Sequence, residues 1–82
     1  MDHAAKKTTI LEAVKEIDRK MLDATIETVN RRLKKRGFDV TYYSTNRILR
    51  DLVSEGDLCQ SDMGLDNKTN KYFPAAKQRM MA

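Results

Sequence analysis

The stretch VTYYSTNRILRDLVSEGDL, from Val40 to Leu58, decides the fold expected for this chain of 82 residues. Its core-facing positions recur at helical spacing and therefore share one face; they are Thr45, Ile48, Leu49 and Leu52, with Val53 beside them. Thr41 is the expected N-cap of this helix, and Gly56 is its expected C-terminal stop. The stretch thus predicts a helix that ends shortly before Leu58.

Two further helices are expected before this one. Thr9 and Glu12 have the spacing of a capping box, so the first helix is predicted to start at Thr9 and to run to about Lys20. Its apolar face consists of Ile10, Val14, Ile17 and Met21. Asp23 is the expected N-cap of the second helix, which stops at Gly37. The apolar face of this helix consists of Leu22, Ile26, Val29 and Leu33.

After the third helix the pattern changes to that of short strands. Leu58–Ser61 and Lys71–Phe73 are strand-compatible, and Pro74 follows the second of them. The segment SDMGLDNKTN, from Ser61 to Asn70, is rich in turn formers. The sequence therefore predicts an α+β chain in which three helices precede a β-hairpin.

The order of these elements and the residues of two stretches resemble winged helix-turn-helix DNA-binding domains. Val40–Leu58 looks like their third helix, with a capping Ser or Thr, a polar exposed face, a Leu-x-x-Leu core and Glu-Gly before the first wing strand. KYFP, from Lys71 to Pro74, is similar to the second wing strand. The resemblance covers residues 9–74. It implies a small three-helix winged helix-turn-helix domain with a C-terminal β-hairpin wing, whose third helix, residues 42–55, enters the major groove.

Size and composition limit the class of protein. Hydrophobic residues make up 40% and charged residues 34% of the chain, as in a globular domain, and the length leaves no room for a two-lobed enzyme or a repeat array. One domain, residues 9–74, is expected, with residues 1–8 as a flexible N-terminus and 75–82 as a tail that is a short helix or disordered. No apolar run is long enough to cross a bilayer or to act as a signal peptide, so we expect a cytoplasmic protein without membrane contact.

The sequence contains few residues suited to catalysis or to binding a cofactor. The only histidine is His3, at the N-terminal end, and the only cysteine is Cys59. A lone cysteine excludes an intramolecular disulfide and a cysteine-built zinc site. No glycine-rich phosphate loop is present. We therefore expect no enzyme, no cofactor, no metal and no small-molecule ligand.

Charge is distributed unevenly along the chain, whose formal net charge is +4. Residues 31–50 carry seven basic side chains and one acidic side chain, whereas residues 51–67 carry five acidic side chains and no basic ones. A basic block of this size in a small domain predicts a positive face, for which polyanions are natural partners.

The face of the third helix opposite its core positions is the first candidate site. It presents Tyr43, Asn46, Arg47 and Arg50, with Tyr42 near the N-terminal edge. Arginine can fork onto guanine O6 and N7, asparagine onto adenine N6 and N7, and tyrosine can donate to phosphate. The alternative is a solvated helix face on which the two tyrosines cover the edge of the core.

Two basic segments are further candidates. Within RRLKKR, Arg31, Lys34 and Lys35 point away from the core, where they can contact phosphates or steer DNA from a distance. Complementarity to the helix dipole explains the same charges without a partner. In the wing, phosphate or minor-groove contact suits Lys68, Asn70 and Lys71, and the alternative is a polar loop.

Two functions follow from these patterns. The resemblance implies sequence-specific binding of double-stranded DNA by a small transcriptional regulator that lacks a sensor domain, with a homodimer as one option for its assembly. The alternative is a winged-helix module that binds a protein and no nucleic acid. An acidic patch offers such a module a surface; its members are Asp51, Glu55 and Asp57, with Asp62 and Asp66.

Overall fold

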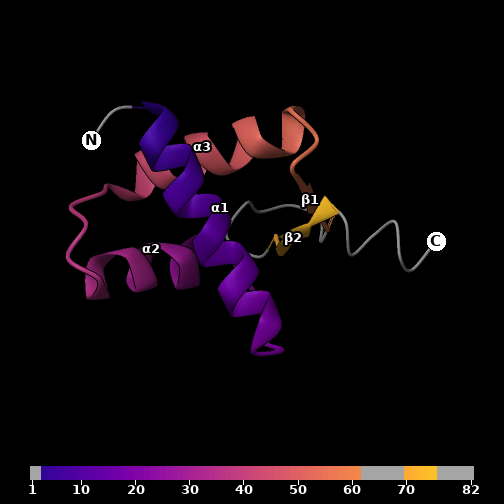
Figure 1. Ribbon diagram of the computed structural model, residues 1–82, viewed down its shortest axis with the longest axis horizontal. Helices are drawn as coiled ribbons and strands as arrows, with labels where there is room; N and C mark the ends of the chain where they lie inside the picture. Colours follow the sequence, from indigo (N-terminus) through magenta and orange to yellow (C-terminus); the bar gives the residue numbers. More distant parts are fainter. Residues whose placement is uncertain (1–2, 62–69, 76–82) are drawn as a thin grey trace.

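Three helices and a two-stranded antiparallel sheet make up the parts of the chain described by the computed structural model, residues 3–61 and 70–75. The helices are α1 (His3–Arg19), α2 (Ile26–Lys35) and α3 (Tyr42–Ser54), and the strands are β1 (Leu58–Gln60) and β2 (Tyr72–Pro74). Helix α1 runs across α2 and α3 and contacts both, and the strands lie beyond the C-terminal end of α3 (Figure 1). The α+β class and the predicted order of elements are confirmed.

Helix α1 starts earlier than the sequence predicted. It begins at His3, so Thr9 is not its N-cap and residues 3–8, expected to be flexible, form its first turns. The Thr9 hydroxyl donates to the Ala5 carbonyl at 2.8 Å, which is how threonine is accommodated inside a helix. Alanine and lysine are good helix formers, and Lys7 makes an ion pair with Glu55 just after α3. Local propensity and this tertiary contact together extend the helix.

The C-terminal end of α1 is closed by a residue in the left-handed region. Met21 has a φ of 60°, and it is the only non-glycine residue with positive φ in the described ranges. The Leu22 amide donates to the Ile17 carbonyl at 3.1 Å and the Met21 amide to the Asp18 carbonyl at 2.9 Å, the two bonds of a Schellman motif. Met21 was predicted on the core face, but it is 93% exposed because the helix ends before it.

Met21→Gly should therefore stabilise the domain by about 0.5 to 1 kcal/mol. A side chain in the left-handed region costs roughly 1 to 2 kcal/mol, and the greater freedom of glycine in the unfolded chain offsets part of the gain. Urea denaturation followed by circular dichroism measures the change. Lys15→Gly, inside α1, is the matched control and should destabilise by about 1 kcal/mol. A lower midpoint for Met21→Gly would contradict the expected strain.

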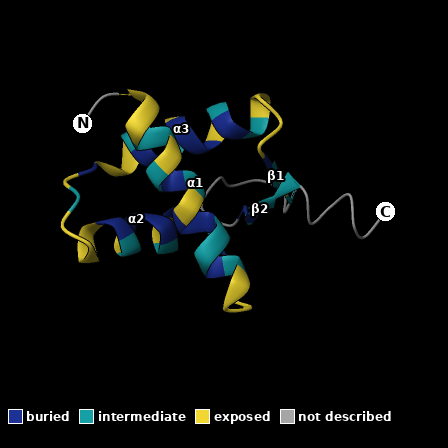
Figure 2. Ribbon diagram, in the orientation of Figure 1, coloured by how far each residue is buried: buried dark blue, intermediate teal, exposed yellow. Residues whose placement is uncertain are grey.

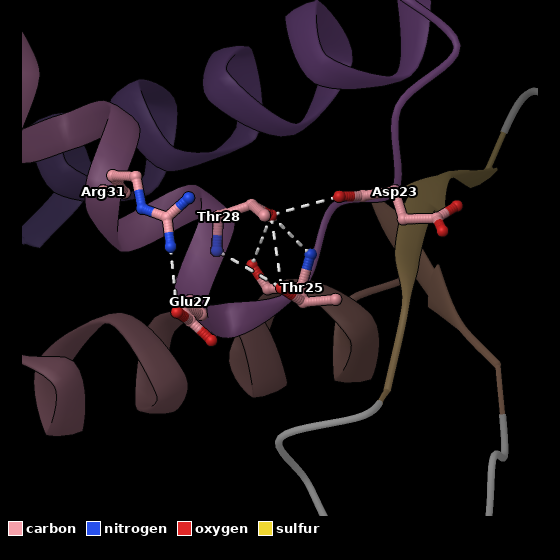
Figure 3. Close-up of polar contacts among 5 residues, drawn as sticks. All are labelled: Asp23, Thr25, Glu27, Thr28 and Arg31. Carbon is pink, nitrogen blue, oxygen red and sulfur yellow. Dashed lines mark hydrogen bonds and ion pairs between the residues drawn. The ribbon is translucent and has the colours of Figure 1, made fainter.

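Helix α2 is capped by Thr25 and not, as predicted, by Asp23. The Thr28 amide donates to the Thr25 hydroxyl oxygen at 3.2 Å, and the Thr25 amide donates to the Thr28 hydroxyl oxygen at 2.8 Å (Figure 3). The Thr28 hydroxyl also bonds to the Asp23 carbonyl at 3.1 Å. Leu22 was predicted on the apolar face of α2, but it precedes the cap and is 58% exposed.

The predicted glycine stops and the cap of α3 are confirmed. Gly37 and Gly56 have φ values of 90° and 88°, and each follows the end of its helix. The Thr41 hydroxyl oxygen accepts from the Ser44 amide at 3.0 Å. The buried face of α3 is the predicted one: Thr45, Ile48, Leu49 and Leu52. Apolar spacing and caps thus determine this helix locally.

The hairpin pairs β1 with β2 in antiparallel register, with Cys59 opposite Phe73. The outer edge of β2 also forms a backbone hydrogen bond. The Tyr72 amide donates to the carbonyl of Ala24, in the turn between α1 and α2, at 2.7 Å. Tyr72 itself is 2% exposed. The sheet is therefore attached to the helices on two sides, through α3 and through this turn.

One apolar core joins all the elements. It is formed by the inward faces of the helices together with residues of the turns and strands (Figure 2). Its members are Ile10, Ala13, Val14, Ile17, Ala24, Ile26, Val29, Leu33, Val40, Ile48, Leu49, Leu52, Leu58 and Tyr72. Since every helix buries only one face, the opposite faces are left for solvent and partners.

Candidate nucleic-acid interface

The outward face of α3 carries a shallow hollow of about 410 Å³. Tyr43, Arg47 and Arg50 are exposed around it, and Asn46 also lines it. The structure thus brings together the four side chains that the sequence placed on one face. Since the opposite side of the same helix is buried, the core holds their backbone positions fixed relative to one another.

Two residues of this hollow were missed in the sequence. Asp51 and Ser54 line its C-terminal end. Asp51 follows Arg47 by four residues, so the helical wheel that grouped the arginines could have found it. The Asp51 carboxylate lies 3.8 Å from His3 Nε2. The negative charge of Asp51 makes this end of the hollow less favourable for an anionic partner.

Tyr72 of β2 is a buried residue whose hydroxyl is influenced by the charge of Arg50. Burial raises the pKa of the Tyr72 hydroxyl, and the positive charge of Arg50 opposes that shift. Tyr42, at the first position of α3, is 40% exposed. Tyr42 is not among the residues that line the hollow.

Asn46 is oriented differently from the sequence expectation. Its Oδ1 atom is buried and has no hydrogen-bond partner among the described residues. Contact with adenine N6 and N7 requires both the oxygen and the nitrogen of the amide to face the base. As it lies, Asn46 presents only one end of the amide to a ligand, so the predicted paired contact with adenine needs a rotation of the side chain.

The orientation of α3 against α2 is held by a buried polar pair. The Thr45 hydroxyl donates to Asn30 Oδ1 at 3.0 Å, and the two residues are 0% and 8% exposed. A buried hydrogen bond of this kind tolerates little displacement, because an unpaired partner would lose its hydration without compensation. It therefore fixes the register of the two helices.

Thr45→Val should lower the free energy of unfolding by about 1 to 2 kcal/mol, because it keeps the side-chain volume but leaves Asn30 Oδ1 without its donor. Asn30→Leu added to Thr45→Val removes both polar groups and should recover part of the loss. Urea denaturation of the two single variants and the double variant measures the coupling. Strictly additive losses would contradict a direct interaction between these side chains.

The basic run of α2 is divided between two flanks of the helix. Arg32 Nη1 lies 2.6 Å from Glu16 Oε1 of α1, and Arg36 also makes an ion pair with Glu16. Lys34 follows Asn30 by four residues and therefore lies on the flank toward α3. Lys35 instead lines a groove between α1 and α2. Lys34 and Lys35 were both predicted to contact or steer DNA, but only Lys34 lies on the flank nearer α3.

Arg31, the third residue of the expected phosphate set, is exposed and pairs with Glu27. Arg31 Nη2 lies 2.9 Å from Glu27 Oε1, one turn earlier in α2 (Figure 3). Pairs of this kind at a surface are weak, so Arg31 can exchange this partner for another anion. Like Lys35, Arg31 lines the groove between α1 and α2.

The hairpin offers less than the sequence predicted. Asn70 is buried, 7% exposed, and is not available as a surface contact. It precedes Tyr72 by two residues, and side chains two apart in an extended chain share a side. Lys71 Nζ lies 3.2 Å from Asp23 Oδ2, in an exposed ion pair. Lys68 lies outside the described residues.

The acidic patch of the alternative function is partly neutralised within the chain. Glu55 pairs with Lys7, and the Asp51 carboxylate lies near His3. Asp57 is exposed. Asp62 and Asp66 lie outside the described residues. The N-terminal turns of α1 therefore cover part of the surface that this alternative requires.

No group of three or more His, Cys, Asp or Glu side chains within residues 3–61 and 70–75 could hold a metal ion, and Cys59 is half-buried. None of the helices there has both the length and the apolar character needed to pass through a bilayer. No protein-family model, curated protein or solved structure matches the chain.

Proposed function

We propose that this chain is a winged helix-turn-helix domain that binds double-stranded DNA sequence-specifically, with α3 as its recognition helix. The order α1, α2, α3, β1, β2 supports this fold, as does the bridge from Ala24 to β2. One observation carries the functional proposal. The outward face of α3 gathers Tyr43, Arg47 and Arg50 on a helix whose other side is committed to the core.

The chemistry of this face divides into base and phosphate contacts. Arg47 and Arg50 can each fork onto guanine O6 and N7, which is the commonest specific contact in the major groove. Tyr43 can donate its hydroxyl to a phosphate oxygen. Lys34, on the α3 flank of α2, is a further phosphate ligand that would add salt-dependent affinity without specificity.

A protein of this kind would act by occupying its site on DNA. The proposal includes no catalytic step and no bound cofactor. The protein would serve as a small transcriptional regulator that binds a palindromic site as a homodimer. The purely protein-binding alternative has less support, because Glu55 already pairs with Lys7 of α1 and the Asp51 carboxylate lies near His3.

Binding to random-sequence duplex at several salt concentrations tests the first half of the proposal. The logarithm of the affinity should fall with the logarithm of the salt concentration, by about 0.9 for each phosphate contact. Fluorescence anisotropy with labelled duplex between about 50 and 200 mM salt covers the useful range. Absence of binding at the lower end, or affinity that does not respond to salt, would overturn DNA binding as the function.

Selection of bound duplexes from a random pool tests the second half. A consensus sequence should emerge, and a palindromic consensus would also identify the dimer, since operator symmetry mirrors protein symmetry. If the bound pool remains random in sequence, the protein is a non-specific DNA binder and the recognition role of α3 is wrong.

A further inference from the structure

A second surface lies between the C-terminal half of α1 and the outer side of α2. It is a groove of about 660 Å³, called here the α1–α2 groove. Its lining includes five cationic side chains, Lys20, Arg31, Arg32, Lys35 and Arg36. Two carboxylates, those of Glu16 and Asp23, also line it, so the groove has a clear excess of positive charge.

Glu16 organises the basic side of this groove. Its carboxylate pairs with both Arg32 and Arg36 across the two helices. Desolvation tends to raise the pKa of Glu16, but the hydrogen bond from Arg36 and the charges of Arg32, Arg36 and Lys20 outweigh it and hold the pKa below the ordinary value. One carboxylate thus positions two guanidinium groups and cannot neutralise both. Lys35 lies beside them on the same helix.

The other end of the α1–α2 groove is apolar and exposed. Leu22 lines it and is 58% exposed, and the neighbouring Met21 is 93% exposed. Both lie in the turn between the Schellman motif of α1 and the Thr25–Thr28 capping box, and Figure 3 shows the capping box. This turn is therefore held at both ends. Because the backbone of this turn is already held, a partner that packs against these side chains orders little further backbone.

The α1–α2 groove lies on the other flank of α2 from the proposed DNA face. Asn30 of α2 bonds to Thr45 of α3, whereas Arg32 bonds to Glu16 of α1. Since Asn30 and Arg32 are separated by about 200° around the helix, these contacts mark opposite flanks. A ligand in the groove therefore need not compete with a duplex on α3.

We propose that the α1–α2 groove docks an acidic peptide segment of a partner protein, with an apolar side chain seated against Leu22 and carboxylates directed to Lys35 and Arg31. The combination of a cationic wall and an exposed apolar end is complementary to such a segment. The phosphate backbone of a nucleic acid fits it less well, because it has no apolar side chain to place against Leu22.

Selection of short random peptides against the full-length protein tests this proposal without using DNA. Enriched peptides should share two or more Asp or Glu residues around a Leu, Ile or Phe. Binding of a synthetic enriched peptide is then measured by fluorescence anisotropy. Failure of any peptide to be enriched, or enrichment of peptides without acidic residues, would overturn the proposal and would leave the DNA-binding function untouched.

Neighbouring lysines provide the matched control. Lys35→Glu should weaken peptide binding by about tenfold or more, because it reverses a charge inside the groove. Lys34→Glu makes the same change one residue earlier, on the other flank of α2, and should alter the affinity by less than about twofold. Equal losses in both variants would show general attraction to a basic protein and would contradict a defined site.

Two further measurements distinguish a bound peptide from the other possible occupants of the groove, a nucleic acid and a second copy of the chain. Leu22→Ala should weaken binding of the peptide by about fivefold. It should leave the midpoint of thermal unfolding of the protein unchanged, since Leu22 is an exposed turn residue. Excess duplex should leave the peptide bound, and displacement by duplex would show that the groove belongs to nucleic acid. Self-association of the chain that Leu22→Glu abolishes would assign the groove to a second copy instead.

Discussion

Leu49→Ala should lower the free energy of unfolding by about 2 to 5 kcal/mol. Leu49 is 0% exposed at the middle of α3, and this helix contacts α1, α2 and β1. The substitution removes buried methyl groups and leaves a cavity that the surrounding elements can fill only in part. A small domain has only about 5 to 15 kcal/mol of stability, so the variant should be partly unfolded at 37 °C.

Urea denaturation followed by circular dichroism measures this loss. Leu22→Ala is the matched control, because it makes the same chemical change at a side chain that is 58% exposed. The control should change the free energy of unfolding by no more than about 0.5 kcal/mol. If Leu49→Ala unfolds at the midpoint of the unmodified protein, the register of α3 is wrong.

Arg47→Ala should weaken binding to the preferred duplex by about 1 to 3 kcal/mol, or roughly 5- to 150-fold, if α3 reads bases. Arg47 is exposed on the face of α3, so the substitution should leave the fold intact. Affinity for random duplex should change little, because a base contact contributes mainly at the correct sequence. The ratio of specific to random affinity should therefore narrow. Anisotropy titrations with both duplexes measure it.

Lys34→Ala is the control for this experiment. A phosphate contact acts on every sequence alike, so the variant should lose affinity for both duplexes and its salt slope should become shallower by about 0.9. If Lys34 only steers DNA, the association rate should fall with little change in slope. Equal weakening of specific and random binding by Arg47→Ala would mean that α3 does not read bases.

Helix α3 was predictable because its signals are local. Its N-cap at Thr41 and its stop at Gly56 lie within the helix and its immediate flanks, and the spacing of its core positions needs no knowledge of the rest of the chain. The outward face follows directly, since a helix with one buried side presents the other. The same local logic would have placed Asp51 next to Arg47.

The starts of α1 and α2 were predicted wrongly because similar local signals compete. Thr9 with Glu12 has the spacing of a capping box, yet the Thr9 hydroxyl bonds to a carbonyl inside the helix. Asp23 is a good N-cap residue, but Thr25 makes a reciprocal pair with Thr28. Which of two neighbouring caps is used depends on where the turn must direct the chain, and spacing alone does not specify that.

The α1–α2 groove could not be found from the sequence. It depends on the left-handed conformation of Met21, which ends α1 early and turns Leu22 outward. It also depends on Glu16 meeting Arg32 and Arg36 across two helices. A helical wheel placed Lys34 and Lys35 together as outward residues, and only the packing of α1 against one flank of α2 separates them.

The bond between Tyr72 and Ala24 bears on self-association through strand edges. An unpaired edge of a sheet is a template on which another chain can add a strand, and proteins guard against this by shortening or covering their edges. The outer side of β2 is occupied at Tyr72 by the turn between α1 and α2. Among the described strands the open edge is then that of β1, which has 3 residues. So short an edge offers few backbone groups with which a strand of another chain could pair. The sheet is therefore protected against edge-to-edge aggregation.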